Sequence, residues 1–148
     1  MRRFAAAALA WLGAIPAVAA SAEDVMREFH LFGTWAVDCS RPASPANPHV
    51  SDVNPSPGLV LEDQDLGPER AVNRYTIVGA TRLSATRLAL DVVFRPGEAG
   101  AERQRLELVV RDGKRRTVFN QPEGGPARVR NGRVIAFGTK TPVLTKCR

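Results

Sequence analysis

The two cysteines are the residues whose type and spacing point most directly to chemistry. Cys39 and Cys147 stand near the two ends of the chain, which has no other cysteine. A reactive thiol would need an activating Cys-x-x-Cys motif or a nearby histidine, and neither is present. We therefore predict a structural disulfide that closes a loop of about 100 residues and contributes roughly 4 kcal/mol to stability. Two buried free thiols are the alternative.

Basic side chains gather around two predicted hairpin turns, Asp112-Gly113 and Asn131-Gly132. Because guanidinium groups bind phosphate and carboxylate bidentately, one basic face would suit an anionic envelope component or an acidic protein partner. The alternative is a solvated face whose charges pair with acidic residues elsewhere in the chain. The candidate basic patch comprises Arg111, Lys114, Arg115, Arg116, Arg128, Arg130 and Arg133.

Motifs for catalysis, metal binding and nucleic-acid binding are missing from the sequence. His30 and His49 are the only histidines, and they belong to no cluster with metal-ligand spacing. The chain has no Gly-x-Ser-x-Gly elbow and no phosphate-binding glycine loop. No aromatic residues interleave with the basic ones, as single-stranded nucleic acid would require. The sequence therefore predicts a protein that is not an enzyme and that binds no metal, cofactor or nucleic acid.

The N-terminal segment is typical of a secretory signal peptide. Two arginines precede an apolar run over residues 4–14, and small residues at 20–22 suit cleavage. The run is short for a membrane-spanning helix of about 20 residues. We expect removal of residues 1–22 and a single domain over residues 23–148, free in the periplasm or outside the cell and without integral membrane insertion.

Charge is distributed unevenly along the predicted domain. Residues 23–102 carry seven lysines and arginines against twelve acidic residues, whereas residues 103–148 carry twelve against three. A split of this size could mark a basic face that meets an anionic partner.

The first strand signal is the alternation over residues 34–39. It places Trp35, Val37 and Cys39 on one face, which we expect to point inward. Five prolines follow within residues 41–57, so we predict a long surface loop there, a candidate lid or contact loop.

Period-two patterns continue through the rest of the chain. In the predicted Asp112-Gly113 hairpin, Leu106, Leu108 and Phe119 belong to the core. Further strands are expected at residues 59–61, 73–78, 88–94, 105–111, 129–134 and 143–147. The hairpin register pairs Arg111 with Lys114, Val110 with Arg115, Leu108 with Thr117 and Leu106 with Phe119, and the second turn pairs Val129 with Val134 and Arg130 with Arg133.

Many short strands with frequent turns indicate an all-β domain, a small antiparallel barrel or, alternatively, a sandwich. A disulfide between the first and last strands favours the barrel, because closure makes those strands neighbours. Helix is expected only over residues 24–30, where Asp24 would cap a short turn. Val25, Met26 and Phe29 would then plug one end of the barrel.

Gly33 and Trp35 at the head of the first strand resemble the Gly-x-Trp motif of lipocalins and other calycin-type barrels. The resemblance implies a tryptophan across the barrel floor, packed against a late arginine, for which Arg130 and Arg133 are candidates. It makes Gly33 and Trp35 a candidate ligand floor and implies a carrier of a small apolar ligand.

Two further resemblances concern the ends of the domain and its size. Gly-Thr-Trp-Ala-Val-Asp-Cys at 33–39 and Thr-Pro-Val-Leu-Thr-Lys-Cys at 141–147 are similar to small uncharacterised periplasmic proteins of bacteria. In size, export and single disulfide, the chain also resembles secreted barrel inhibitors of lysozyme or proteases. The sequence thus predicts a secreted non-enzymatic β-barrel that binds an anionic envelope component or a protein. A lipocalin-like carrier and an inhibitor of an envelope-directed hydrolase are the alternatives.

Overall fold

The computed structural model describes residues 19–148, so the first eighteen residues of the predicted signal peptide lie outside the described part. Within it the chain forms one short helix, α1 (Ala22–Glu28), and is otherwise β. The strands are β1 (Gly33–Ala36), β2 (His49–Ser56), β3 (Leu59–Asp65), β4 (Asn73–Arg82), β5 (Arg87–Phe94), β6 (Glu102–Arg111), β7 (Lys114–Pro122), β8 (Val129–Arg130), β9 (Arg133–Val134) and β10 (Leu144–Lys146).

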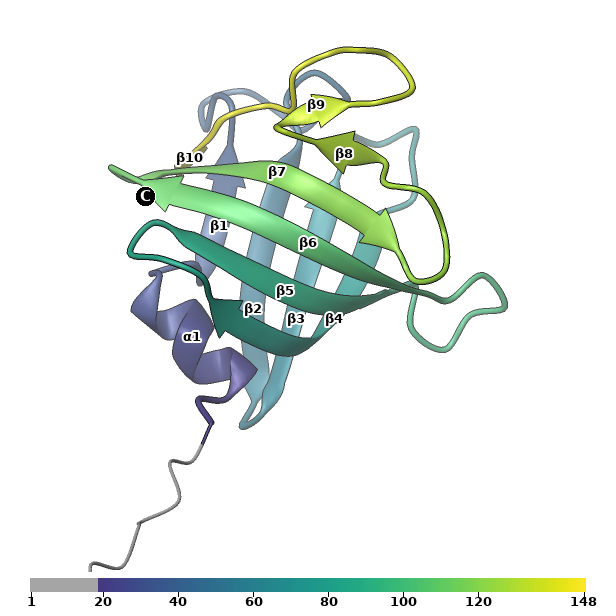
Figure 1. Cartoon of the computed structure of the whole chain (residues 1–148). Helices are drawn as coiled ribbons and strands as arrows, with labels where there is room; N and C mark the ends of the chain where they lie inside the picture. The colour runs from purple at the N-terminus through teal and green to yellow at the C-terminus, as the bar shows by residue number, and fades with distance from the viewer. Residues whose placement is uncertain (1–18) are drawn as a thin grey trace, which may run out of the picture.

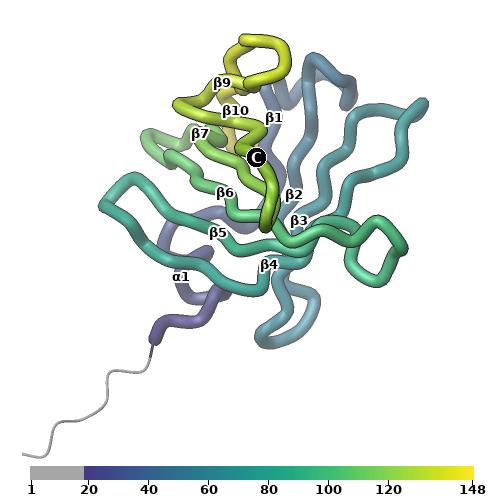
Figure 2. The backbone as a smooth tube through the Cα atoms, turned by 45° about the vertical axis from the view of Figure 1, so that its right-hand side comes forward, coloured from purple at the N-terminus to yellow at the C-terminus, as the bar shows by residue number. Residues whose placement is uncertain are grey.

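Eight strands of the described chain close into an antiparallel barrel, in the order β10-β1-β2-β3-β4-β5-β6-β7, with β7 pairing back to β10. The β8–β9 hairpin extends from β7 at one end of the barrel, and α1 covers the other end (Figures 1 and 2). The predicted barrel is therefore confirmed over the sandwich.

The predicted disulfide is present and joins the chain segments that follow β1 and β10. Cys39 and Cys147 have Cα atoms 5.5 Å apart across a sequence separation of 108 residues. The backbone N–H of Cys147 also donates to the Thr34 carbonyl at 2.8 Å. The disulfide therefore links the segments that follow the first and last strands, where the barrel closes.

Helix α1 closes its end of the barrel with apolar side chains, as predicted. Val25, Met26 and Phe29 are buried against the core. The predicted cap is wrong by three residues: Ser21 is the N-cap, and Asp24 is the third helical residue of a capping box. Ser21 Oγ accepts from the Asp24 backbone N–H at 3.1 Å, and the Asp24 carboxylate accepts from Ser21 in return.

The end of β1 differs from its prediction. Trp35 is buried, but the strand ends at Ala36, and Val37 and Cys39 are exposed. Asp38 is the physical reason, since its carboxylate accepts from the Ser40 backbone N–H at 3.0 Å and turns the chain out of the sheet.

The predicted loop over residues 41–57 is too long, because its second half is strand β2. Val50 and Asp52 point into the barrel, and Pro55 falls where the β2–β3 register shifts, a position that needs no proline N–H. The part that is loop is held by the buried Asn47 side chain, whose Nδ2 donates to the carbonyls of Arg41 and Pro42.

Both two-residue turns are confirmed, with φ of 53° and 68° at Asp112-Gly113 and 51° and 68° at Asn131-Gly132. The predicted register holds except for one pair. A bulge in β7 moves Phe119 opposite Glu107, and Leu106 pairs with Asn120 instead. Leu106 and Leu108 are buried in the core, but Phe119 is only half-buried and lies outside the core cluster.

Candidate functional site

A cavity of about 250 Å³ lies inside the barrel, at the end opposite α1. It is bounded by strands on both sides of the barrel and by the segments around β8, β9 and β10. Its lining combines buried polar groups with apolar ones. The lining residues are Pro48, Val50, Glu62, Gln64, Tyr75, Leu106, Arg115, Arg116, Thr117, Asn120, Val129, Val134, Thr141, Pro142 and Leu144.

A buried ionic triad forms the floor of this cavity. Arg115 is only 4% exposed, and its Nη1 and Nη2 bind Asp52 Oδ2 at 2.5 Å and Glu62 Oε2 at 2.7 Å. The guanidinium carbon of Arg115 also lies over the Trp35 ring, 5.8 Å from the ring centroid. The triad therefore separates the polar cavity from the apolar half of the barrel that α1 closes.

The surroundings of Asp52 favour the protonated form of its carboxyl group. Burial raises the pKa of Asp52 well above its ordinary value, and the neighbouring Glu62 raises it further against the opposing charge of Arg115. Asp52 Oδ1 has no hydrogen-bond donor among the described residues.

The protonation state of Arg115 follows from the same contacts. Burial opposes its charge, but Asp52 and Glu62 outweigh burial and raise the pKa of Arg115 above its ordinary value. The guanidinium therefore stays charged, and its two bound carboxyl groups hold it in place at the cavity floor.

A chain of polar side chains leads from the surface to the cavity wall. Arg128 Nη1 and Nη2 bind the two oxygens of Glu102, each at 2.8 Å. Gln104 Nε2 donates to Glu102 Oε1 at 2.6 Å, and Asn120 Nδ2 donates to Gln104 Oε1 at 2.8 Å. Asn120 Oδ1 is buried and has no hydrogen-bond partner within the described residues.

The bulge in β7 explains why Asn120 faces the cavity. Leu108 pairs with Thr117 and Glu107 pairs with Phe119, so Val118 is the extra residue. A bulge shifts the inward-facing positions of a strand by one residue. Thr117 before it and Asn120 after it therefore both line the cavity, and the Val118 carbonyl accepts from the Gly132 N–H at 2.9 Å.

Tyr75 contributes a hydroxyl group to the cavity wall. Its ring lies 5.0 Å from that of Phe94, centroid to centroid. Burial raises the pKa of Tyr75 to about 12, and the charge of Glu62 adds to this effect. The hydroxyl is therefore neutral at physiological pH.

The predicted ligand floor, Gly33 and Trp35, lies outside the internal cavity. Trp35 is 1% exposed, its Nε1 donates to the Leu31 carbonyl at 2.8 Å, and neither Trp35 nor Gly33 lines the internal cavity. The predicted late arginine is wrong, because Arg130 and Arg133 are exposed and neither lies over the tryptophan ring. Arg115 on one strand and Lys146 on another lie over the tryptophan ring instead, Lys146 Nζ at 5.4 Å from its centroid.

The seven residues of the predicted basic patch do not form one free face. Assigning Arg115 to the surface is wrong, because alternation along β7 turns it into the barrel. Arg116 is half-buried and binds the Gly132 carbonyl at 2.5 Å and Thr141 Oγ1 at 3.0 Å. Arg111 pairs with Asp112, Arg128 with Glu102, and Arg133 with the Gly138 carbonyl, while Lys114 and Arg130 are exposed.

Part of the charge difference between the two halves of the chain is used in ion pairs within the barrel. Acidic residues of the first half bind basic residues of the second at Asp52–Arg115, Glu62–Arg115, Glu102–Arg128 and Asp91–Arg105. Strand order is the physical reason, because an antiparallel barrel brings early and late strands together.

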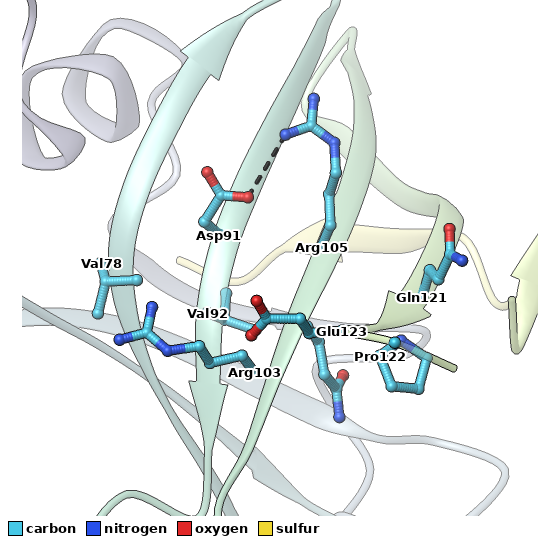
Figure 3. A pocket seen from close by; sticks show the side chains of 10 residues that line it. Val78, Asp91, Val92, Arg103, Arg105, Gln121, Pro122 and Glu123 are labelled. Atoms are coloured by element: carbon cyan, nitrogen blue, oxygen red, sulfur yellow. Dashed lines mark hydrogen bonds and ion pairs between the residues drawn. The ribbon is translucent and has the colours of Figure 1, made fainter. Parts of the chain in front are cut away.

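A second hollow of about 340 Å³ lies on the outer wall of the barrel (Figure 3). Arg103 and Glu123 stand along it, and Arg105 Nη1 reaches Asp91 Oδ1 at 3.4 Å. Its charged side chains are exposed and can all be hydrated. The internal cavity is the stronger candidate because its polar groups are shielded from water.

Two absences apply to the described part of the chain. Residues 19–148 contain no group of three or more His, Cys, Asp or Glu side chains that could hold a metal ion. No helix in that range has the length and apolar character needed to cross a membrane.

Asp52, Glu62 and Asn120 were not predicted as site residues, and Arg115 was predicted on the surface, although strand alternation marks three of these four as inward-facing. The predicted pairing of Val110 with Arg115 already places Arg115 on the inward face. Asp52 and Glu62 each stand two residues after an inward-facing valine, Val50 or Val60, and therefore share its face of the strand. No sequence signal marks Asn120, because its orientation depends on the bulge.

Comparison with known proteins adds no relative to this description: no family model, no curated protein and no solved structure matches the chain.

Proposed function

We propose that this protein is a non-enzymatic binding module that holds a small polar molecule in the internal cavity. The observation that supports this proposal is the lining of the cavity, in which polar side chains such as Gln64, Arg116 and Thr117 stand beside apolar ones. Polar groups in a pocket favour a ligand that offers them hydrogen-bond partners. The cavity volume of about 250 Å³ suits a ligand of roughly ten heavy atoms or fewer.

The setting of the binding module outside the cytoplasm is part of the same proposal. A long-range disulfide is typical of proteins that fold in an oxidising compartment. We propose that the chain is exported by its N-terminal signal and acts in the periplasm or beyond.

A polar ligand is favoured over the apolar ligand of the carrier alternative. An apolar molecule would leave polar side chains of the lining, such as Gln64 and Thr117, without partners, and such a mismatch weakens binding. The apolar side of the cavity, which includes Leu106 and Leu144, can contact the hydrocarbon part of a small amphipathic molecule. Binding to an anionic envelope component and inhibition of a hydrolase stay predictions from the sequence.

Ligand-observed NMR with propionamide and toluene tests the proposal. Wild-type protein should bind propionamide more tightly than toluene, and Thr117→Trp should abolish binding because the indole fills the cavity. Val109→Phe is the matched control, since Val109 is half-buried and lines an outer hollow of the barrel. Equal binding by the Thr117→Trp variant, checked for folding by circular dichroism, would place the site elsewhere and overturn the proposal.

A further inference from the structure

The loop that follows β9 exposes two large apolar side chains. Phe137 is 80% exposed, more than any other large apolar residue of the described chain, and Ile135 is 54% exposed. Figure 1 shows this loop, the tip loop (residues 135–138), projecting at the end of the barrel opposite α1. Apolar side chains gathered on a projecting loop mark an interaction site more often than isolated ones do.

Hydrogen bonds hold the tip loop in this position. The Gly138 N–H donates to the Val134 carbonyl at 2.8 Å, and the Val134 N–H donates to the Thr139 carbonyl at 2.8 Å. Arg133 Nη1 donates to the Gly138 carbonyl at 3.0 Å. Gly138 has a φ of 65°, which a residue without Cβ adopts easily. The fold therefore keeps Phe137 directed outward and does not pack it onto the barrel.

Three exposed cations accompany the tip loop, and we call them the tip cations: Arg130, Arg133 and Lys140. Arg130 lies directly opposite Arg133 in the β8–β9 ladder, and Lys140 bridges to Arg133 from the other side. None of the three forms an ion pair within residues 19–148. Residues 124–148 contain six lysines and arginines and no acidic residue. Like charges directly opposite each other destabilise a ladder, so an external anion would stabilise this hairpin.

Strand alternation places charge and apolar surface on the same face. Val129 pairs with Val134, and both line the cavity. The neighbouring residues Arg130, Arg133 and Ile135 therefore lie on the face of the hairpin that is turned away from the cavity. That face leads directly into the tip loop.

We infer that the tip loop docks on a membrane surface that contains anionic lipids, with Phe137 and Ile135 among the headgroups and the tip cations against lipid phosphates. Apolar side chains flanked by Lys and Arg are the combination that binds such surfaces. A four-residue projection offers far less area than the roughly 1,200–2,000 Å² of a stable protein interface. A second copy of the chain would bring like charges together. This surface lies outside the cavity, so the inference does not rest on the proposed function.

Co-sedimentation with lipid vesicles tests the apolar contact. Wild type should bind mixed vesicles, phosphatidylcholine and phosphatidylglycerol in a roughly 2:1 ratio, at least about tenfold more tightly than phosphatidylcholine vesicles. Phe137→Ser should weaken binding to mixed vesicles by about tenfold. Val78→Ser is the matched control, because Val78 is 51% exposed and lies on the outer wall of the barrel (Figure 3), and it should leave binding unchanged.

A pair of double variants tests the charges. Arg130→Gln with Arg133→Gln should weaken binding to mixed vesicles by about tenfold or more, yet should unfold at no lower urea concentration, since it removes two opposed like charges. Arg103→Gln with Lys114→Gln removes the same charge from exposed positions that form no ion pair within the described residues. It should change binding by no more than about twofold.

Phe137→Trp locates the contact directly. Mixed vesicles made with brominated phosphatidylcholine should quench the new tryptophan, whereas Val78→Trp should show no more quenching than wild type. All forms share one N-terminal segment, so any membrane contact of residues 1–22 contributes equally. Failure of wild type to prefer mixed vesicles overturns the inference. Unchanged binding by Phe137→Ser, or an unquenched Phe137→Trp on bound protein, places the contact elsewhere and also overturns it.

Discussion

Asp52 lies directly opposite Glu62 in the β2–β3 ladder, and both side chains bind the guanidinium of Arg115 from the same side of the barrel interior. Two carboxylates this close in a buried site do not both ionise readily. Burial therefore favours the protonated form of Asp52, whose pKa is raised well above its ordinary value.

The proton on Asp52 makes stability depend on pH with a definite sign. Because the folded pKa lies above the ordinary value of 3.8, its contribution is complete below the unfolded pKa and is lost as pH rises through the folded pKa. Asp52→Asn mimics the protonated acid and removes this dependence. Urea unfolding from about pH 4 to 9 should show the variant gaining stability relative to wild type as pH rises.

A ¹³C titration of the carboxyl groups checks the same assignment directly. The Asp52 signal should titrate well above 3.8 in the folded protein. A stability difference between Asp52→Asn and wild type that is constant over this pH range, together with an Asp52 transition near 3.8, would contradict it.

Arg115→Met should be strongly destabilising, by about 3–5 kcal/mol, because it leaves the Glu62 carboxylate buried without a cation. Urea unfolding measures the loss. The triple variant that combines Arg115→Met with Asp52→Leu and Glu62→Leu should lose less stability than Arg115→Met alone, since no buried charge is then left. Arg111→Met, at an exposed position, should change stability by no more than about 0.5 kcal/mol. Equal losses for Arg115→Met and Arg111→Met would rule out a structural role for the triad.

Removal of the disulfide by Cys39→Ser with Cys147→Ser should lower the free energy of unfolding by roughly 4–5 kcal/mol, since the bond closes a long loop. Reduction of the wild-type protein should give the same loss in urea unfolding. A change below about 1 kcal/mol would mean that the β1–β10 hydrogen bonds close the barrel without the covalent bond.

Ser21→Ala should destabilise the protein by about 1 kcal/mol because it removes the N-cap of α1, and Ser21→Asp should restore most of the loss. Thermal unfolding measures both effects. The same cap bears on signal-peptide processing, since the predicted cleavage after Ala22 would remove Ser21. The intact mass of the exported protein distinguishes this from cleavage after Ala20, which would keep the cap.

Local rules predicted much of the fold. Residue types at short spacing predicted both two-residue turns and most of the hairpin register, because turn geometry and strand alternation are local properties. They also predicted the apolar plug formed by Val25, Met26 and Phe29. The disulfide followed from there being only two cysteines, once export and barrel closure were assumed.

The sequence by itself therefore determined the fold class, the disulfide and the inward face of most strands. Tertiary structure decided the site. Arg115 was assigned to a surface patch although its partner Val110 already placed it inside, and only the packed barrel shows Asp52 and Glu62 beside it. Asn120 lines the cavity because Val118 bulges from β7. The triad joins strands that are distant in the sequence, and no local pattern contains such a contact.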